Sequence, residues 1–432
     1  MSLVETPRSM DPMWPSPSVA RVFMAVMLLA ATFSFIHRYV PSVLVDPIRS
    51  EMGISDVQFS LLQGTAFALL YCTASLIFGM LADRTVRRNL LILGVATWTV
   101  GTILFGLADS YEQLLASRCL VGLGEATLGP ASISLLCDFF PPDKLGKAIA
   151  VSLFGATLGS SLAFGIGGWM LDAAAAGLFS PLPMVGNLTP WRQVVVLLGV
   201  VGLLIIPALL TFPEPMRRTS KPITGLGVGS LWSLRERIGP IILLGGVLAL
   251  ADFGYSIWID ALLTRTHQFS ASLAGSVLSA VLLVGGIGGG WYGGVLCDKA
   301  HRESGQDGRV RIVRRSAIAM LAFGLLLLLP SGWAAVASFA LWQFAANVAY
   351  VGCAASLQDQ ITDRTRGLAS AVSLCTSIGL GMGLGPTSVA WLNQSIGQGQ
   401  DALASSLIVV LCISASLMLV TASWLLARLA KT

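Results

Sequence analysis

Long apolar stretches recur along the whole chain, and shorter polar segments separate them. An α-helix rises about 1.5 Å per residue, so about 20 apolar residues are enough to cross the roughly 30 Å hydrocarbon core of a bilayer. The pattern therefore predicts twelve membrane-spanning helices. They cover residues 19–45, 57–82, 89–108, 112–137, 145–171, 191–212, 237–264, 271–296, 311–329, 332–358, 367–393 and 402–427.

The composition supports the same class. Hydrophobic residues make up 55% of the chain and charged residues only 11%, whereas a soluble domain carries roughly 25% charged residues. We therefore expect an all-α membrane protein. The seven cysteines show no paired spacing, which favours packing roles over a disulfide framework or a metal site. No metal and no cofactor is expected.

The basic residues indicate an orientation. If both termini are cytoplasmic, 22 of the 27 Lys and Arg residues fall in tails and loops on that side of the membrane. This bias follows the positive-inside rule. It also explains the net charge of +5 without nucleic acid, which we do not expect as a partner. Residues 1–18 are polar and Pro-rich and lack the apolar region of a signal peptide, so a cytosolic tail is expected there.

Two motifs recur half a chain apart. "GMLADRTVR" at residues 79–87 returns as "GVLCDKAHR" at residues 294–302, a shift of 215. "GKAIAVSL" at residues 146–153 returns as "GLASAVSL" at residues 367–374, a shift of 221. Two matches at nearly one shift indicate an internal repeat.

The repeat predicts two pseudo-symmetric six-helix bundles, residues 19–212 and 237–432. Residues 213–236 are rich in Pro, Gly, Ser and basic residues, which is typical of a cytosolic linker. Parallel repeats of this kind build secondary transporters, in which two halves rock about a central site and give alternating access.

The first motif also resembles a family signature. Gly79, Leu81, Asp83, Arg84, Arg87 and Arg88 resemble the loop 2–3 signature of the major facilitator superfamily. The resemblance implies the twelve-helix fold and a cytoplasmic latch, in which the Asp and its bases contact the opposite half. The residues expected at this gate are Gly79, Asp83, Arg84, Arg87 and the repeat counterpart Asp298. If these residues served only to orient the protein in the membrane, that role would explain the basic residues but not the Asp that both copies of the motif contain.

Four ionisable residues lie inside predicted membrane helices: His37, Arg38, Arg118 and Glu125. An isolated charge in hydrocarbon costs at least about 2.5 kcal/mol, so such residues are usually functional and face a cavity or a partner. Arg118 and Glu125 are seven residues apart, which places them on one helix face about 10 Å apart, too far to touch. Their positions along the predicted helices place them at depths in the bilayer from which they can meet. We therefore expect all four to converge on one cavity in the N-terminal half.

Some of these residues point to one subgroup of the superfamily. "FIHRY" and "LASRCLVGLGEA" resemble the Spinster-like subgroup, whose members move lysolipids and sphingoid lipids and are often coupled to protons. The resemblance implies that Arg118 contacts an anionic or zwitterionic head group and that Glu125 binds the proton. Organic-anion carriers of the superfamily share the second motif loosely. A proton-linked carrier or exporter of small organic anions or drugs is therefore the alternative.

His37 departs from the subgroup, which has an acidic residue at this position. Like charge and desolvation disfavour the imidazolium, so we expect a neutral side chain at pH 7. Three interpretations remain. His37 could sense pH while Glu125 permanently compensates the arginines; Glu125 alone could exchange the proton while His37 contacts substrate; or His37 could simply form an interhelical hydrogen bond.

The C-terminal half offers a counterpart. Asp252 lies 215 residues after His37 and could supply the anion missing from the first helix. Tyr255 and Trp258 are expected on the same side. Gln343 and Asn347 are one turn apart and could line the cavity, although interhelical hydrogen bonding explains them equally well.

The sequence argues against two other classes of protein. A membrane enzyme would need a nucleophile and base or a metal set, but the chain has only three histidines and no HExxH, GxSxG, GKS or GKT motif. A receptor with a carrier fold would not need Asp83 or Glu125. We expect a monomeric transporter in the plasma or inner membrane, with membrane lipids, a small amphipathic or lipid substrate and protons as its partners.

Overall fold

The computed structural model describes residues 14–217, 235–361, 366–397 and 402–429. These residues form helices and connecting turns, and none of them forms a strand. The expected tail (1–18) and linker (213–236) fall largely outside the described residues.

The N-terminal half contains six membrane helices, of which three are built from more than one segment. Its elements are α1 (Pro17–Val43), the short α2 (Val45–Met52), α3 (Asp56–Ser60), the π-helix η1 (Leu61–Ala66), α4 (Phe67–Arg84), α5 (Arg87–Gly106), α6 (Tyr111–Glu125), α7 (Leu128–Phe139), α8 (Pro142–Ala175), α9 (Pro190–Gly202) and α10 (Ile205–Leu209).

The C-terminal half follows the same plan. Its elements are α12 (Arg235–Arg265), α13 (Ala271–Gly324), the 3-10 helix η2 (Leu325–Leu328), α14 (Gly332–Gln360), α15 (Arg366–Thr376), the π-helix η3 (Ser377–Met382), α16 (Gly383–Ile396) and α17 (Ala402–Leu429). The 54-residue α13 bends at Ser304 and at Gly305, whose φ of +60° is a left-handed conformation that glycine adopts readily. It holds two predicted spans.

In the described residues, eleven continuous helices are long and apolar enough to cross a membrane. The longest, Ala271–Leu328, has 58 residues, and its two arms correspond to the predicted spans 271–296 and 311–329. The twelve predicted spans are therefore confirmed.

Large apolar side chains lie exposed around the bundles. In water this surface would be unstable, whereas acyl chains cover it in a bilayer. Examples are Leu69, Leu76, Ile77, Leu153, Trp169, Val284, Trp291, Ile318 and Val420.

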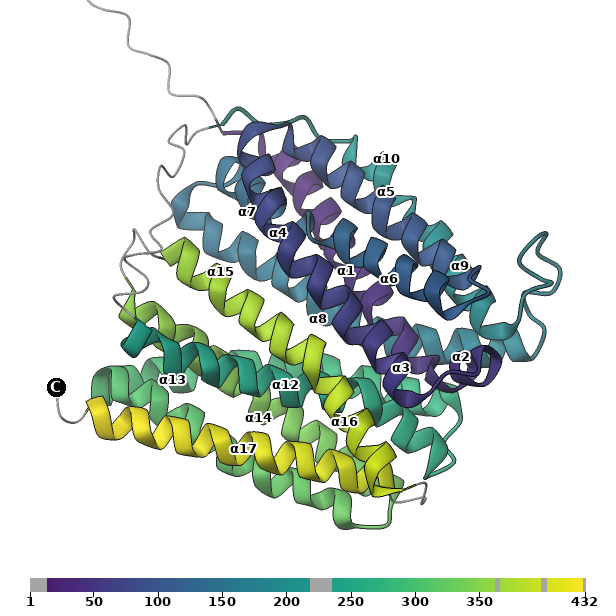
Figure 1. The fold of residues 1–432 in the computed structure, drawn as a ribbon. Coiled ribbons are helices and arrows are strands. Elements are labelled where there is room, and N and C mark those ends of the chain that lie inside the picture. Colours follow the sequence, from purple (N-terminus) through teal and green to yellow (C-terminus); the bar gives the residue numbers. More distant parts are fainter. Residues whose placement is uncertain (1–13, 218–234, 362–365, 398–401, 430–432) are drawn as a thin grey trace, which may run out of the picture.

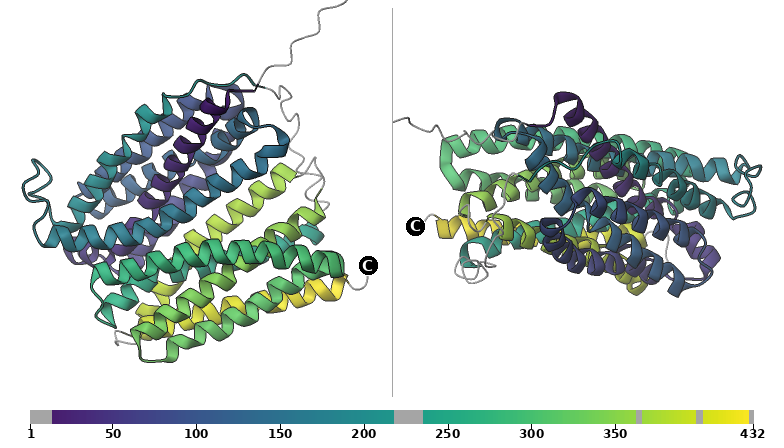
Figure 2. Two further views of the ribbon diagram at one scale, coloured as in Figure 1. Left: turned by 180° about the vertical axis from the view of Figure 1, so that it is seen from behind. Right: turned by 90° about the horizontal axis from the view of Figure 1, so that it is seen from above.

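The two halves lie side by side and touch mainly at one end. Figure 1 and the left view of Figure 2 show the N-terminal bundle (purple to teal) and the C-terminal bundle (green to yellow) converging at one end, where Figure 1 labels α2, α3 and α16. They diverge toward the end that carries residues 213–217 and the C-terminal end of α17. We call these ends the loop end and the linker end.

Glycine allows the halves to approach closely. A Cβ atom at Gly168 of α8 would overlap the carbonyl oxygen of Ala271 in α13, and one at Gly64 of η1 would overlap that of Met382 in η3. Small residues at helix crossings are typical of membrane proteins. Both crossings join the two bundles.

One ion pair recurs in each half. Arg87 pairs with Asp138 at the end of α7, and Arg309 pairs with Asp359 near the end of α14. The shifts, 222 from Arg87 to Arg309 and 221 from Asp138 to Asp359, match the sequence repeat. The same contact thus ties the same two helices together in both bundles.

Candidate substrate and coupling site

A buried ion pair joins the first and fourth membrane helices. Arg38 of α1 donates from Nε to Oε2 of Glu125 at 2.9 Å, and its Nη2 contacts the same oxygen. Arg38 is 6% exposed and Glu125 1% exposed. Glu125 is the last residue of α6, where Pro130 cannot donate a backbone hydrogen bond and the helix breaks before α7. The pair is therefore held at a helix break inside the membrane.

Aromatic rings surround the guanidinium of this pair. The Cζ atom of Arg38 lies 4.5 Å from the ring centroid of Phe35, 4.7 Å from that of Phe67 and 5.3 Å from that of Tyr71. Ring faces attract cations most strongly where water is excluded. The rings thus stabilise the arginine and give the site an apolar wall.

Arg118 lies beside the pair, and neutral groups hold it. Its Nη2 donates to Oε1 of Gln63 at 2.8 Å, and its two terminal nitrogens also contact the carbonyls of His37 and Arg38 at 3.3 and 3.4 Å. No carboxylate of the described residues forms an ion pair with Arg118, which is 2% exposed. One positive charge is therefore left over in the N-terminal half of the site.

The side chain of His37 packs against a different helix. Its Nε2 lies 3.1 Å from the carbonyl oxygen of Leu198 in α9. A Cβ atom at Gly202 would lie 2.6 Å from Cε1 of His37, so the glycine makes room for the ring. This is the interhelical hydrogen bond of the third interpretation, and only the backbone of His37 contacts Arg118.

Asp252 of α12 lies across the interface. Its Oδ2 accepts a hydrogen bond of 3.1 Å from the hydroxyl of Tyr350 in α14. The ring of Tyr39, next to Arg38 in α1, stacks on Phe253 with centroids 6.3 Å apart and an interplanar angle of 9°. Tyr39 is within electrostatic reach of Asp252 as well as of Arg38 and Glu125. The five predicted coupling residues therefore lie in one region, although His37 faces away from its centre.

The predicted lining residues of the C-terminal half are more scattered. Tyr255 donates to Ser338 at 2.9 Å inside the bundle, and Trp258 donates to the carbonyl of Pro386 at 2.9 Å. Asn347 donates to the carbonyl of Gln343 at 2.9 Å.

Sequence reasoning missed the aromatic side chains of the site. Tyr39, Tyr71 and Tyr350 were not predicted, and neither was Phe67. A signal existed for some of them, because Phe35 and Tyr39 flank Arg38 in "FIHRY" and residues three or four apart share a helix face.

This arrangement of two bundles around buried charges agrees with a family comparison. The model of the Major Facilitator Superfamily matches residues 27–386. The chain belongs to the major facilitator superfamily. It is accordingly a transporter, not an enzyme, and an integral multi-pass membrane protein.

Individual relatives within the superfamily differ in what they carry. An "MFS-type efflux pump" of Mycolicibacterium smegmatis is 25% identical over 91% of this chain and 90% of the relative. The "Sphingosine-1-phosphate transporter SPNS2" of Danio rerio is 32% identical, but over 35% of this chain and 30% of the relative. A solved structure of a bacterial homolog to the human lysosomal transporter Spinster, inward-facing and occupied, has a TM-score of 0.80 at 24% identity and covers 96% of this chain and 98% of its own.

The superfamily signature lies at the linker end. Arg87 is buried and bonds within its own bundle, to Asp138 and, at 2.8 Å, to Glu214. Asp83 accepts from Arg217 at 2.6 Å through its carbonyl oxygen. Gly79 has open space around it, and Arg84 and Asp298 are exposed. No ion pair of these residues crosses to the other bundle within the described ranges, so their gating role stays a prediction.

The two bundles are joined by charge at the loop end. Arg265, at the end of α12, donates to Asp46 at 2.7 Å and to both oxygens of Asp56 at 3.0 and 3.1 Å. Asn393 of α16 adds a bond of 3.0 Å to Asp56, and Arg49 pairs with Asp56 at 2.9 Å. We call these five residues the loop-end network.

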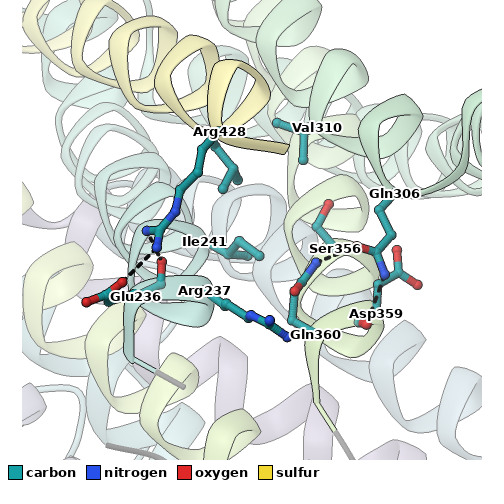
Figure 3. Close-up of a pocket in the computed structure, with 10 residues that line it drawn as sticks. Glu236, Arg237, Ile241, Gln306, Val310, Ser356, Asp359, Gln360 and Arg428 are labelled. Atoms are coloured by element: carbon teal, nitrogen blue, oxygen red, sulfur yellow. Dashed lines mark hydrogen bonds and ion pairs between the residues drawn. The ribbon is translucent and has the colours of Figure 1, made fainter. Parts of the chain in front are cut away.

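A polar cavity of about 350 Å³ opens at the linker end of the C-terminal bundle. Figure 3 shows Arg428 paired with Glu236 on one side and Gln306 bonded to Gln360 on the other, with the side chain of Arg237 between them. None of the predicted coupling residues lines this cavity. It is separate from the central site.

Proposed function

We propose that the protein is a proton-linked secondary active transporter that moves a lipid-like amphipathic substrate, such as a lysophospholipid or sphingoid lipid, by alternating access. The observation that carries this proposal is the buried group of Arg38, Glu125 and Arg118 beside the interface of two rocking bundles. A transporter needs a site that both sides of the membrane can reach in turn, and this position between parallel repeats suits it.

The ion pair suggests how a proton and a substrate are linked. Glu125 neutralises Arg38, and its second oxygen, Oε1, accepts no hydrogen bond. A proton on Glu125 would weaken the pair and release Arg38, which could then join Arg118 in holding an anionic head group. Proton binding and anion binding would favour each other, which is a coupling between two ligands.

Separate observations support an apolar tail on the proposed substrate. Phe35, Phe67 and Tyr71 form an apolar wall beside the two arginines. The relative named for sphingosine-1-phosphate transport carries a lipid of this kind.

A second function has specific support. A guanidinium binds a carboxylate as readily as a phosphate. The efflux pump of M. smegmatis matches nearly the whole chain, and a "Probable sulfoacetate transporter SauU" of Cupriavidus necator is 25% identical over 72% of it. Export of small organic anions or drugs is therefore the alternative.

We further propose that both termini are cytoplasmic and that the protein is a monomer. The Lys and Arg bias toward the linker end supports this orientation. The divergence of the bundles at that end then corresponds to an inward-facing conformation. Asp83, Arg84, Arg87 and Asp298 would close that end when the bundles rock.

The test is uptake of radiolabelled lysophospholipid into proteoliposomes, with and without an imposed pH gradient. We expect the gradient to increase flux several-fold and Glu125→Gln to abolish the increase. Glu112→Gln, an exposed acid on the same helix, is the matched control and should keep it. If wild-type flux does not depend on the pH gradient, proton coupling is ruled out. Uptake no faster than in protein-free vesicles, together with transport of an organic anion, would favour the alternative.

A further inference from the structure

Asp252 differs from the carboxylates of this protein that are paired with arginine. Glu125, Asp56 and Asp138 are each bound by an arginine. Asp252 forms no ion pair with a basic residue in the described part of the chain, and its Oδ2 accepts a hydrogen bond from the neutral hydroxyl of Tyr350. Its Oδ1 is buried and accepts no hydrogen bond. A carboxylate in this state lacks a cation.

A neighbouring group has the same need. Gln343 of α14 lies beside Asp252 and is 8% exposed, and its Oε1 is also buried without a donor. The amide nitrogen of Gln343 faces Asp252 as a neutral donor, so the pair still lacks a positive charge. A ligand that brings N–H donors or a positive charge would satisfy both.

Aromatic rings complete the surroundings. Tyr350 donates to the carboxylate, and Tyr39, stacked on Phe253, is within electrostatic reach of it. Carboxylates and ring faces together are the groups that recognise ammonium ions in proteins.

The charges of the two halves are complementary. Arg38 and Arg118 against Glu125 leave one positive charge on the N-terminal side, and Asp252 leaves one negative charge on the C-terminal side. A ligand with an anionic and a cationic group would match both sides.

We propose that Asp252, with Tyr350 and Tyr39, determines substrate specificity by binding an ammonium group of the substrate. This inference rests on the proposed transport function and adds the chemical class of the group that the C-terminal bundle recognises. The anionic group then faces Arg118 and Arg38, so the substrate bridges the two bundles.

The experiment compares two lipids with one acyl chain in the same proteoliposomes. Lysophosphatidylcholine carries an ammonium group and lysophosphatidylglycerol does not. We expect Asp252→Asn to lower the flux of lysophosphatidylcholine about tenfold, which corresponds to about 1.4 kcal/mol. The flux of lysophosphatidylglycerol should change less than twofold. Asp252→Glu should restore the preference. Asp260→Asn is the matched control, because Asp260 is a buried acid about two turns further along α12 that also forms no ion pair among the described residues.

Several outcomes would overturn the inference. Equal losses of flux for both lipids would assign Asp252 to coupling or folding. An equal change of lipid preference in Asp260→Asn would show that the effect is not specific to Asp252. If the wild type transports neither lipid, the proposed function fails, and binding is then measured by thermal stabilisation in detergent with the same two lipids. Stabilisation by the choline lipid that Asp252→Asn removes would still support the ammonium site, whereas equal stabilisation of both proteins would refute it.

Discussion

At the scale of single residues, Arg38 and Glu125 depend on each other. Each is almost fully buried, and neither has another oppositely charged partner within ion-pair distance among the described residues. A buried charge left without its partner is strongly destabilising, whereas replacing a whole pair by apolar groups is often neutral.

This dependence predicts a double-mutant cycle. Glu125→Leu alone and Arg38→Met alone should each lower the free energy of unfolding by about 3–5 kcal/mol, and the double variant should lose less than either. Thermal unfolding in detergent measures this. Additive losses would mean that the pair is not a structural unit. Gradient-driven flux should be absent from all three variants, because each lacks one member of the pair that we propose links the proton to the substrate, even where the double variant regains stability.

The sequence predicted that buried charges converge but not how they pair. Spacing showed only that Arg118 and Glu125 share a face. Which arginine reaches Glu125 depends on the rotation of α1 about its axis. Packing sets that rotation, including the space that Gly202 leaves for His37, and periodicity along one helix carries no information about it.

At the scale of elements, the loop-end network fixes the ends of α12, α16 and the first loop together. Two short π-helices, η1 and η3, lie just inside it, and Thr65 of η1 donates to the carbonyl of Gly383 at 2.7 Å. π-Helical turns often occur at functional positions. The helices were predicted from hydropathy, but these turns were not, because their apolar pattern resembles that of an α-helix.

Breaking the network should favour the opposite conformation. Arg265→Gln removes the cation that three contacts share, so the loop end should open more often. A cysteine placed at the buried Ser60 of α3, outside the network, should then react faster with a membrane-impermeant maleimide. We expect a rise of about threefold to tenfold, corresponding to 0.7–1.4 kcal/mol. Arg49→Gln, which leaves the link between the bundles intact, is the control. An unchanged rate would show that glycine packing alone holds this end closed.

Another contact at this end depends on pH. Glu51 follows α1 in the first loop; burial alone would raise its pKa, but hydrogen bonds from Thr189, Arg192 and Trp191 lower it below its usual range. Its contribution to stability is therefore present above the unfolded pKa of about 4.3 and lost as pH falls through the lower folded value. Melting temperatures of Glu51→Gln and wild type should differ at pH 7 and converge toward pH 3. A constant difference would mean that Glu51 does not titrate in this range.

At the scale of the whole molecule, the proposed alternating access requires that the two bundles pack against each other in two different ways. The repeat and the hydropathy pattern predicted twelve helices in two halves. They could not predict which end is closed, since both conformations use the same helices and differ by small contact energies at two interfaces.

Two native thiols offer a probe of this motion. Cys72 of α4 donates to the carbonyl oxygen of Cys375 in α15 at 3.7 Å, which brings two cysteines together across the bundles. Copper phenanthroline should take two electrons and two protons from these thiols and join them as a disulfide. Flux should then fall at least about fivefold and return with dithiothreitol, because the proposed rocking would separate the two helices. Cys72→Ser should be insensitive, and full flux in the cross-linked protein would exclude relative movement here.

The balance of buried charge has a consequence for the energetics of the cycle. Arg38 and Arg118 are matched by Glu125 and Asp252 across the interface. A single charge moved through the membrane field responds by about 2.3 kcal/mol per 100 mV, but a site whose charges sum to zero does not. In the proposed cycle, the empty carrier should therefore return at a rate that does not depend on membrane voltage. A zwitterionic substrate would not change this, so the proton would be the species through which the electrical gradient drives transport.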